Sequence, residues 1–395
     1  MEKIISLCYN DAAREGCPVK NEMRRVAVVG GGAGGLAAAI AAAGEGCTVA
    51  IYEMRSRVGK KLLQTGNGRC NLTNRHITPA DYNHPEFVAP VLNTWSTERL
   101  LDFFAELGLW TVSDGEGRIY PRSDTASSVL DVLRLRCAAL GVEEHCASEV
   151  VSLSRSGSGW QLSFREGENA FADAVIIATG GETALLKPLG HELKPFAPIL
   201  CPLKTDTAPI RGLTGLRVRC TVTLSRRGKI LASEAGEVLF RDFGVSGIVI
   251  LNMSRFAQKG DTLTLDLLPE LTEAELSGRL RSHTLRGEEI FTGIFHRRVG
   301  EALLRNTLSR SPEALSRAAK NLVLTVQGAA DEKSAQVTRG GAAVSGFDPA
   351  TLASRACPGL YCIGEALDVD GRCGGFNLHW AFSSGLTAGR GAAHG

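Results

Sequence analysis

The chain has few aromatic residues and no hydrophobic run that could cross a membrane. Phe, Trp and Tyr make up only 6% of its 395 residues, which leaves little material for the aromatic and basic clusters of RNA-binding surfaces. Its most apolar helical stretch, Leu36–Ala43, is far shorter than the roughly 18 to 20 residues of a transmembrane helix. A signal-peptide hydrophobic region is also lacking, because four polar residues interrupt the first twenty: Asn10, Asp11, Arg14 and Glu15. We therefore expect a cytoplasmic protein with no membrane partner.

Charge and cysteine spacing point to neither a nucleic acid nor a metal. The formal net charge of +2 gives no reason to expect a polyanionic partner. None of the 11 cysteines forms a Cys-x-x-Cys pair, and the 8 histidines show no metal-ligand spacing with them. Cysteines of a cytoplasmic chain are usually free thiols. We expect a small-molecule substrate, no metal and no nucleic acid, while the oligomeric state is left open.

The stretch Arg25–Glu53 has the pattern of a dinucleotide-binding unit. Val26–Val29 predicts a buried strand, an alanine-rich helix is expected over Leu36–Ala43, and a second strand over Thr48–Tyr52 ends on Glu53. A glycine-rich turn joins the first strand to the helix. Because strand, turn, helix, strand and terminal acid all agree, we interpret the stretch as a nucleotide site rather than as an ordinary turn.

Three glycines of this turn fill the positions of the dinucleotide fingerprint. Gly30 makes the tight turn, Gly32 lets a pyrophosphate approach the backbone, and Gly35 lets helix and strand pack closely. The phosphates would lie on the free N–H groups of the helix N-terminus. Glu53, placed after the second strand, could accept hydrogen bonds from a ribose 2′-OH. No second complete fingerprint follows, so a dedicated nicotinamide site cannot be read.

Three further glycine-bearing segments could serve the same ligand. Arg55–Asn74 is either a surface turn or a loop that clasps a cofactor with backbone donors and basic side chains. Phe171–Gly181 predicts a buried strand that runs into Thr179 and Gly180. Gly359–Gly389 predicts a strand, a polar loop and a helix whose N-terminus would present backbone N–H groups.

A change in composition divides the chain. Prolines cluster between 188 and 209, and short strands separated by glycines follow, among them Lys229–Leu231 and Val238–Phe240. Helices are expected to begin at Thr272 and Ser311. We therefore predict an N-terminal extension over 1–23, a discontinuous nucleotide-binding domain over 24–189 and 350–395, and an inserted domain over 190–349. That insertion should be rich in β-structure, with a helical part at about 270–322.

From Arg25 onward the chain resembles the HI0933-like flavoproteins, also called YhiN-like or BaiN-like. The resemblance rests on four stretches: Val28–Gly35 with Glu53, Thr65–Asn71, Gly244–Gly247 and Gly364–Ala381. It implies an α/β fold, with a discontinuous Rossmann-like FAD-binding domain interrupted by a β-barrel-like and helical substrate domain. It also implies FAD as the cofactor, with NAD(P)H as the expected transient reductant. Cys373 departs from the family pattern, where Thr is expected more often.

The same resemblance assigns cofactor roles by position. Gly30, Gly32, Ala33 and Gly35 would hold the pyrophosphate, with Thr179 and Gly180 nearby, Glu53 the adenosine ribose and Val150 the adenine. The flavin would be lined by Lys61, Thr65, Gly66, Gly68, Arg69, Cys70 and Asn71. Gly364 and Glu365 would meet the ribityl–pyrophosphate region, and Gly375, Phe376, Asn377 and Leu378 the pyrimidine end.

The resemblance implies an FAD-dependent oxidoreductase that uses NAD(P)H to reduce a C=C bond conjugated to a ketone, as in a steroid-like enone, by hydride transfer through flavin N5. Such a reductase needs a proton donor, and the candidates are Tyr120, Arg339 and His379. Each is also explained by packing or by a loop charge. The alternatives left open are an amine oxidase that uses O₂, similar to aminoacetone oxidases, a flavin-dependent RNA-modifying enzyme, and a non-catalytic flavin sensor.

Overall fold

A five-stranded parallel sheet lies at the centre of the larger part of the molecule. The computed structural model describes residues 23–330, 335 and 337–395, and within these the sheet has the order β19-β10-β1-β2-β6. Its strands are β1 (Arg25–Val29), β2 (Thr48–Glu53), β6 (Glu143–Cys146), β10 (Ala174–Ile177) and β19 (Leu360–Cys362). Every neighbouring pair is parallel, so the carboxyl ends of the strands share one edge, where open α/β sheets bind ligands.

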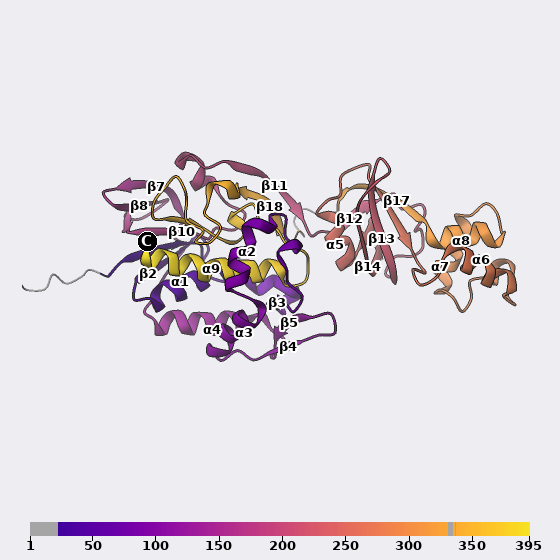
Figure 1. Cartoon of the computed structure of the whole chain (residues 1–395), viewed down its shortest axis with the longest axis horizontal. Helices are drawn as coiled ribbons and strands as arrows, with labels where there is room; N and C mark the ends of the chain where they lie inside the picture. The colour runs from indigo at the N-terminus through magenta and orange to yellow at the C-terminus, as the bar shows by residue number, and fades with distance from the viewer. Residues whose placement is uncertain (1–22, 331–334, 336) are drawn as a thin grey trace, which may run out of the picture.

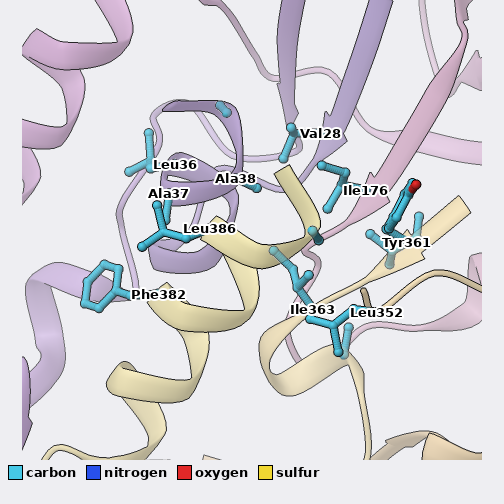
Figure 2. Close-up of a cluster of buried hydrophobic side chains, with 14 of the residues drawn as sticks. Val28, Leu36, Ala37, Ala38, Ile176, Leu352, Tyr361, Ile363, Phe382 and Leu386 are labelled. Carbon is cyan, nitrogen blue, oxygen red and sulfur yellow. The ribbon is translucent and has the colours of Figure 1, made fainter. Parts of the chain in front are cut away.

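Two helices from opposite ends of the chain pack together against this sheet. They are α1 (Ala33–Gly44) and α9 (Phe376–His394), and α4 (Ala126–Ala139) lies beside α1. A side chain on Gly385 of α9 would clash with the Gly34 carbonyl of α1, so glycine permits this close approach. Figure 2 shows Leu36 of α1 and Leu386 of α9 in the same apolar cluster. Helices from the beginning and the end of the chain therefore contribute to the same hydrophobic core.

Smaller elements surround the central sheet. Two antiparallel three-stranded sheets have the orders β7-β8-β9 and β3-β5-β4. Their strands are β3 (Thr73–Asn74), β4 (Thr111–Ser113), β5 (Arg118–Pro121), β7 (Val150–Ser156), β8 (Gly159–Phe164) and β9 (Ala170–Ala172). The helices α2 (Pro85–Thr94) and α3 (Thr97–Glu106) precede β4. Contacts of β8 with β10 and of β9 with β1 attach the first of these small sheets to the central one.

The segment between β10 and β19 contains a closed six-stranded barrel with its own core. The barrel order is β12-β15-β14-β13-β16-β17. Its strands are β12 (Leu203–Thr205), β13 (Arg217–Arg226), β14 (Lys229–Arg241), β15 (Gly244–Ser246), β16 (Thr262–Asp266) and β17 (Leu322–Ala329). Its buried side chains form a cluster separate from that of the central sheet. This separation of cores is what an inserted domain requires.

Helices and a two-stranded ribbon complete this segment. The helices are α5 (Ile248–Ser254), α6 (Glu273–Ser282), α7 (Arg297–Arg305) and α8 (Pro312–Lys320). The antiparallel ribbon of β11 (Leu193–Ile199) and β18 (Val337–Ala342) joins the barrel to the rest of the chain. Figure 1 shows the barrel, and beyond it α6 to α8, extending away from the central sheet. No helix in the described residues is long and apolar enough to cross a membrane.

The structure confirms the predicted fold class and several element starts. Thr272 and Ser311 are the N-caps of α6 and α8, and each hydroxyl accepts a backbone N–H of its helix. The division into two separate strands at Lys229–Leu231 and Val238–Phe240 was wrong, because both belong to β14, which runs unbroken from one to the other. The strand predicted over Phe171–Gly181 is divided at Asp173 between two sheets. The domain boundaries stay a prediction, and the extension 1–23, apart from Met23, lies outside the described residues.

Candidate functional site

The glycine turn after β1 has the geometry of a phosphate cradle. Gly30 has φ +106, and a side chain there would lie 2.5 Å from the Ala178 carbonyl oxygen. A side chain on Gly35 would clash with the Gly30 carbonyl, so helix α1 can lie against the turn only with glycine at this position. Gly32 differs, because a Cβ placed on it would have no described atom within 4 Å apart from those of its own stretch of chain. Gly32 is the N-cap of α1, so open space adjoins the helix N-terminus where an anion binds best.

Glu53 ties this turn to the end of β2. Its carboxylate is buried and accepts hydrogen bonds from the backbone N–H of Gly31 at 2.8 Å and of Arg55 at 2.9 Å. The backbone N–H of Ser148 donates to the Glu53 carbonyl at 2.9 Å, just before Val150 begins β7. The chain leading into Val150, predicted to hold the adenine, therefore lies beside Glu53, predicted to hold the ribose.

The loop after β2 places a buried polar acceptor beside the start of α9. It forms a short 3₁₀ segment, Leu62–Gly68, followed by Cys70 in the left-handed region at φ +58. Cys70 is fully buried, and burial raises the pKa of its thiol to about 12, so this thiol stays protonated. The Oδ1 atom of Asn71 is also buried and has no hydrogen-bond partner in the described part of the chain. It lies 2.9 Å from a Cβ placed on Gly375, the N-cap of α9. A buried acceptor without a partner marks a place where a ligand donor fits.

A carboxylate joins three of the glycine-bearing segments. Glu365 accepts a hydrogen bond from the Lys61 ammonium at 2.5 Å and another from the Thr338 backbone N–H at 2.6 Å. A Cβ on Gly180 would lie 3.8 Å from the same carboxylate. The Thr179 hydroxyl donates to the Glu182 carbonyl. Lys61, Gly180 and Glu365, which come from distant parts of the sequence, therefore meet at the carboxyl edge of the sheet.

A side chain in the first turn of α9 holds the loop that precedes the helix. Gly375 has φ +103, and a side chain there would lie 2.5 Å from the Thr73 carbonyl oxygen. Asn377 accepts from the Gly371 N–H at 2.8 Å and donates to the Gly371 and Arg372 carbonyls at 3.1 Å each. Phe376 is buried and Leu378 half-buried. The Asn377 amide therefore fastens the preceding loop, which leaves the backbone N–H groups of the turn as the donors for a ligand.

His379 is a structural histidine. Its ring is 1% exposed, its Nε2 lies 2.9 Å from the Trp95 carbonyl, and its Nδ1 lies 2.8 Å from the Thr73 hydroxyl. Nε2 must donate to the carbonyl, so Nδ1 accepts from the hydroxyl. Burial lowers the pKa of His379 to about 4, and both nitrogens are already used within the fold.

The other two proton-donor candidates lie in different surroundings. Arg339 is half-buried and donates from Nε to Asp370 at 3.0 Å. Tyr120 lies on β5, with the guanidinium carbon of Arg69 4.3 Å from its ring centroid. Burial raises the pKa of Tyr120, so its hydroxyl keeps its proton at neutral pH. Arg69 itself pairs with the exposed Asp124 at 2.5 Å.

Contacts between the barrel and the loop before α9 had no signal in the sequence. Arg255, at the end of α5, donates from Nε to the buried carboxylate of Asp370 at 2.9 Å. Asn252 of the same helix accepts from the Cys373 N–H at 2.8 Å. The loop containing Asp370 and Cys373 was recognised as polar and glycine-bearing. Its partners were not, because they lie more than a hundred residues away in a segment without a motif.

Two surface hollows lie away from this site. One is lined by Arg24, Asp173 and Gly359 at the amino ends of the central strands, opposite the glycine turn. The other is lined by Gly44 and Arg390 near the far ends of α1 and α9. Neither hollow is lined by a predicted cofactor residue. The candidate site therefore remains the region between the glycine turn and the start of α9.

Comparison with known proteins identifies the family of the chain. The HI0933-like protein Rossmann domain matches residues 24–391. The chain belongs to this family. A relative from Clostridium scindens, named 3-dehydro-bile acid delta(4,6)-reductase, is 37% identical, and the alignment covers 94% of this chain and 99% of the relative. A relative from Escherichia coli, named ribosomal RNA dihydrouridine synthase, is 26% identical over 90% of this chain and 95% of the relative.

A solved structure shares the fold. The open conformation of a flavocytochrome c3 fumarate reductase aligns with a TM-score of 0.51 at 15% identity, covering 94% of this chain and 78% of the other. At this identity the likeness shows the fold alone. The family match and the named reductase make the chain an oxidoreductase.

Proposed function

We propose that the chain is an FAD-dependent reductase of C=C bonds conjugated to a carbonyl group, acting on a steroid-like enone with NAD(P)H as the source of hydride. The observation that carries this proposal is the end-to-end match, at 37% identity, to a relative named 3-dehydro-bile acid delta(4,6)-reductase. The match includes the inserted barrel as well as the Rossmann-like part, so the substrate-side region is shared too.

The residues present fit FAD. Open space at Gly32 suits a pyrophosphate, and the partnerless Oδ1 of Asn71 suits an N–H donor of the flavin ring. Glu53 would hold the adenosine ribose, Glu365 would meet the ribityl–pyrophosphate region, and Lys61, which donates to Glu365, would line the flavin. When bound, FAD supplies hydride transfer through N5. The chain itself binds and orients the two reactants and excludes water.

Reduction of a conjugated C=C bond adds a hydride to the carbon β to the carbonyl and a proton to the α carbon. Of the three candidates, Tyr120 is best suited to hold that proton, because a tyrosine hydroxyl is neutral at pH 7 and the polar groups of the other two candidates are already used within the fold. The only N–H group of neutral His379 already donates a hydrogen bond to the Trp95 carbonyl. Arg339 already donates from Nε to the Asp370 carboxylate. We therefore propose Tyr120 as the donor to the α carbon.

A second candidate function is the reduction of uridine in RNA. The relative named ribosomal RNA dihydrouridine synthase matches 90% of the chain, and the C5=C6 bond of uracil is also conjugated to a carbonyl. The chemistry is therefore the same, and only the substrate differs. The net charge of +2 and the low aromatic content favour the small molecule.

Anaerobic turnover tests the proposal directly. The purified holoprotein is incubated with NADH or NADPH and, in separate reactions, a 3-oxo-4-ene steroid, a 3-oxo-4,6-diene steroid or unmodified ribosomal RNA. The proposal predicts steroid products that gain two hydrogens, as measured by mass spectrometry, with nothing formed when the nicotinamide is left out. Reduced uridine with unchanged steroids would favour the RNA function. A separate aerobic reaction with an amine tests the oxidase alternative: amine oxidation by O₂, together with no reduced alkene in the anaerobic reactions, would overturn the proposal in favour of an oxidase. No turnover in any of these reactions would overturn it in favour of a sensor.

A further inference from the structure

The barrel is attached to the cofactor domain at a specific loop, residues 370–375, which leads into α9. Arg255 donates from Nε to Asp370 Oδ1 at 2.9 Å and from Nη2 to the Asp370 carbonyl at 3.1 Å. The side chains are 5% and 0% exposed. A third guanidinium bond, at 3.2 Å, reaches the Asp81 carbonyl. Buried charges are tolerated when they are paired and hydrogen-bonded in this way, so Arg255 fixes both the side chain and the backbone of Asp370.

Two more barrel residues hold the same loop further along. Asn252 accepts from the Cys373 N–H at 2.8 Å. Its amide nitrogen donates to Glu234 at 2.9 Å, and Glu234 pairs with Arg372 at 2.8 Å. Residues of the inserted segment thus bind the loop at Asp370, Arg372 and Cys373, while Asn377 of α9 binds its Gly371 backbone.

This loop determines where the first amides of α9 point. Gly375, the N-cap, follows Cys373 by two residues and packs against the Thr73 carbonyl. The N-terminus of a helix stabilises negative charge placed near it, and protein groups near the pyrimidine end tune a flavin. Displacement of the loop would move those amides away from the ring and weaken that stabilisation.

We propose that Arg255 and Asn252 are positioning residues of the cofactor site. Acting through Asp370 and Cys373, they hold the start of α9 in place and so raise the reduction potential of bound FAD. The proposal rests on the proposed function, because it takes FAD to be bound with its pyrimidine end at α9. It makes the inserted barrel part of the machinery that tunes the cofactor, in addition to any contact with substrate.

Matched variants test this role in the FAD-loaded protein. Arg255→Met removes the buried guanidinium, and Asn252→Ala, a milder change, removes the acceptor of the Cys373 N–H. Lys320→Met is the control, because Lys320 is a largely buried cation that pairs with Asp266 at 2.7 Å wholly within the inserted segment. The readouts are amide hydrogen exchange over residues 370–377 and the FAD midpoint potential against a reference dye.

We expect faster exchange in Arg255→Met and Asn252→Ala, together with a roughly tenfold loss of the preference for reduced over oxidised FAD, which is about 30 mV for a two-electron couple. Lys320→Met should match the wild type in both readouts. If Arg255→Met does not fold, Asn252→Ala decides. Faster exchange with an unchanged potential would show that the contact is merely structural and overturn the proposal, as would no change in either readout. A wild-type protein that binds no FAD would instead contradict the proposed function itself.

Discussion

Gly32→Ala should separate cofactor binding from folding. Apart from its own stretch of chain, no described atom lies within 4 Å of a Cβ at this position, and φ is −80, which alanine adopts without strain. The cost to the fold is therefore that of an alanine at an N-cap, about 1 kcal/mol or less. The new methyl would, however, occupy the space into which a pyrophosphate must move to reach the N–H groups of α1.

The expected loss of affinity follows from the hydrogen bonds at stake. A hydrogen bond to a charged group contributes about 1.5–3 kcal/mol, so the loss of one bond to phosphate weakens FAD binding about 10- to 150-fold. Isothermal titration of the apoprotein with FAD measures this directly, and thermal unfolding without FAD checks the fold. Gly44→Ala, at the other end of the same helix, where added atoms also meet nothing within 4 Å, is the matched control. A folded Gly32→Ala protein with wild-type affinity would refute the placement of the pyrophosphate.

Three further predictions concern the fold and the proton donor. Gly35→Ala should destabilise the protein by about 3 kcal/mol or more in urea unfolding, because the added methyl group clashes with the Gly30 carbonyl. Gly44→Ala, the control, should be neutral or stabilising. Equal stabilities of the two variants would contradict the close packing at Gly35. Tyr120→Phe should slow substrate reduction about 100-fold or more while flavin reduction by nicotinamide keeps its rate in stopped-flow measurements, and an unchanged rate of substrate reduction would exclude Tyr120. Burial lowers the pKa of His379 from 6.5 to about 4. As the pH falls, the unfolded state therefore takes up a proton before the folded state does. The contribution of His379 to the free energy of unfolding is fully present above pH 6.5 and falls by up to about 3 kcal/mol as the pH drops through 4. His379→Gln should flatten that slope in urea unfolding at several pH values, and a slope equal to that of the wild type would rule out this histidine as its source.

Local patterns predicted the elements around the glycine turn because part of their signal is short-range. A side chain on Gly35 would clash with the carbonyl of Gly30, five residues earlier in the chain, and only glycine avoids that clash. The N-caps at Thr272 and Ser311 were predictable for the same reason, since the capped N–H lies three residues away.

Long-range features could not be read in this way. Lys229–Arg241 is a single strand because β13 and β15 pair along it, and the glycine and polar residues within it suggested a break. The pair formed by Arg255 and Asp370 joins residues 115 positions apart, and no periodicity links them. The role of His379 likewise depends on Thr73 and the Trp95 carbonyl, which only the folded chain brings to it.

The most direct test of the central claim is anaerobic stopped-flow spectroscopy of the purified protein, which records the flavin absorbance in two steps. We predict that NADH or NADPH bleaches the absorbance and that a 3-oxo-4-ene or 3-oxo-4,6-diene steroid then restores it, with one reduced steroid formed for each flavin reoxidised. A protein without bound flavin would contradict the account. So would a flavin that neither nicotinamide bleaches, or one that, once reduced, is reoxidised by O₂ but by no conjugated alkene.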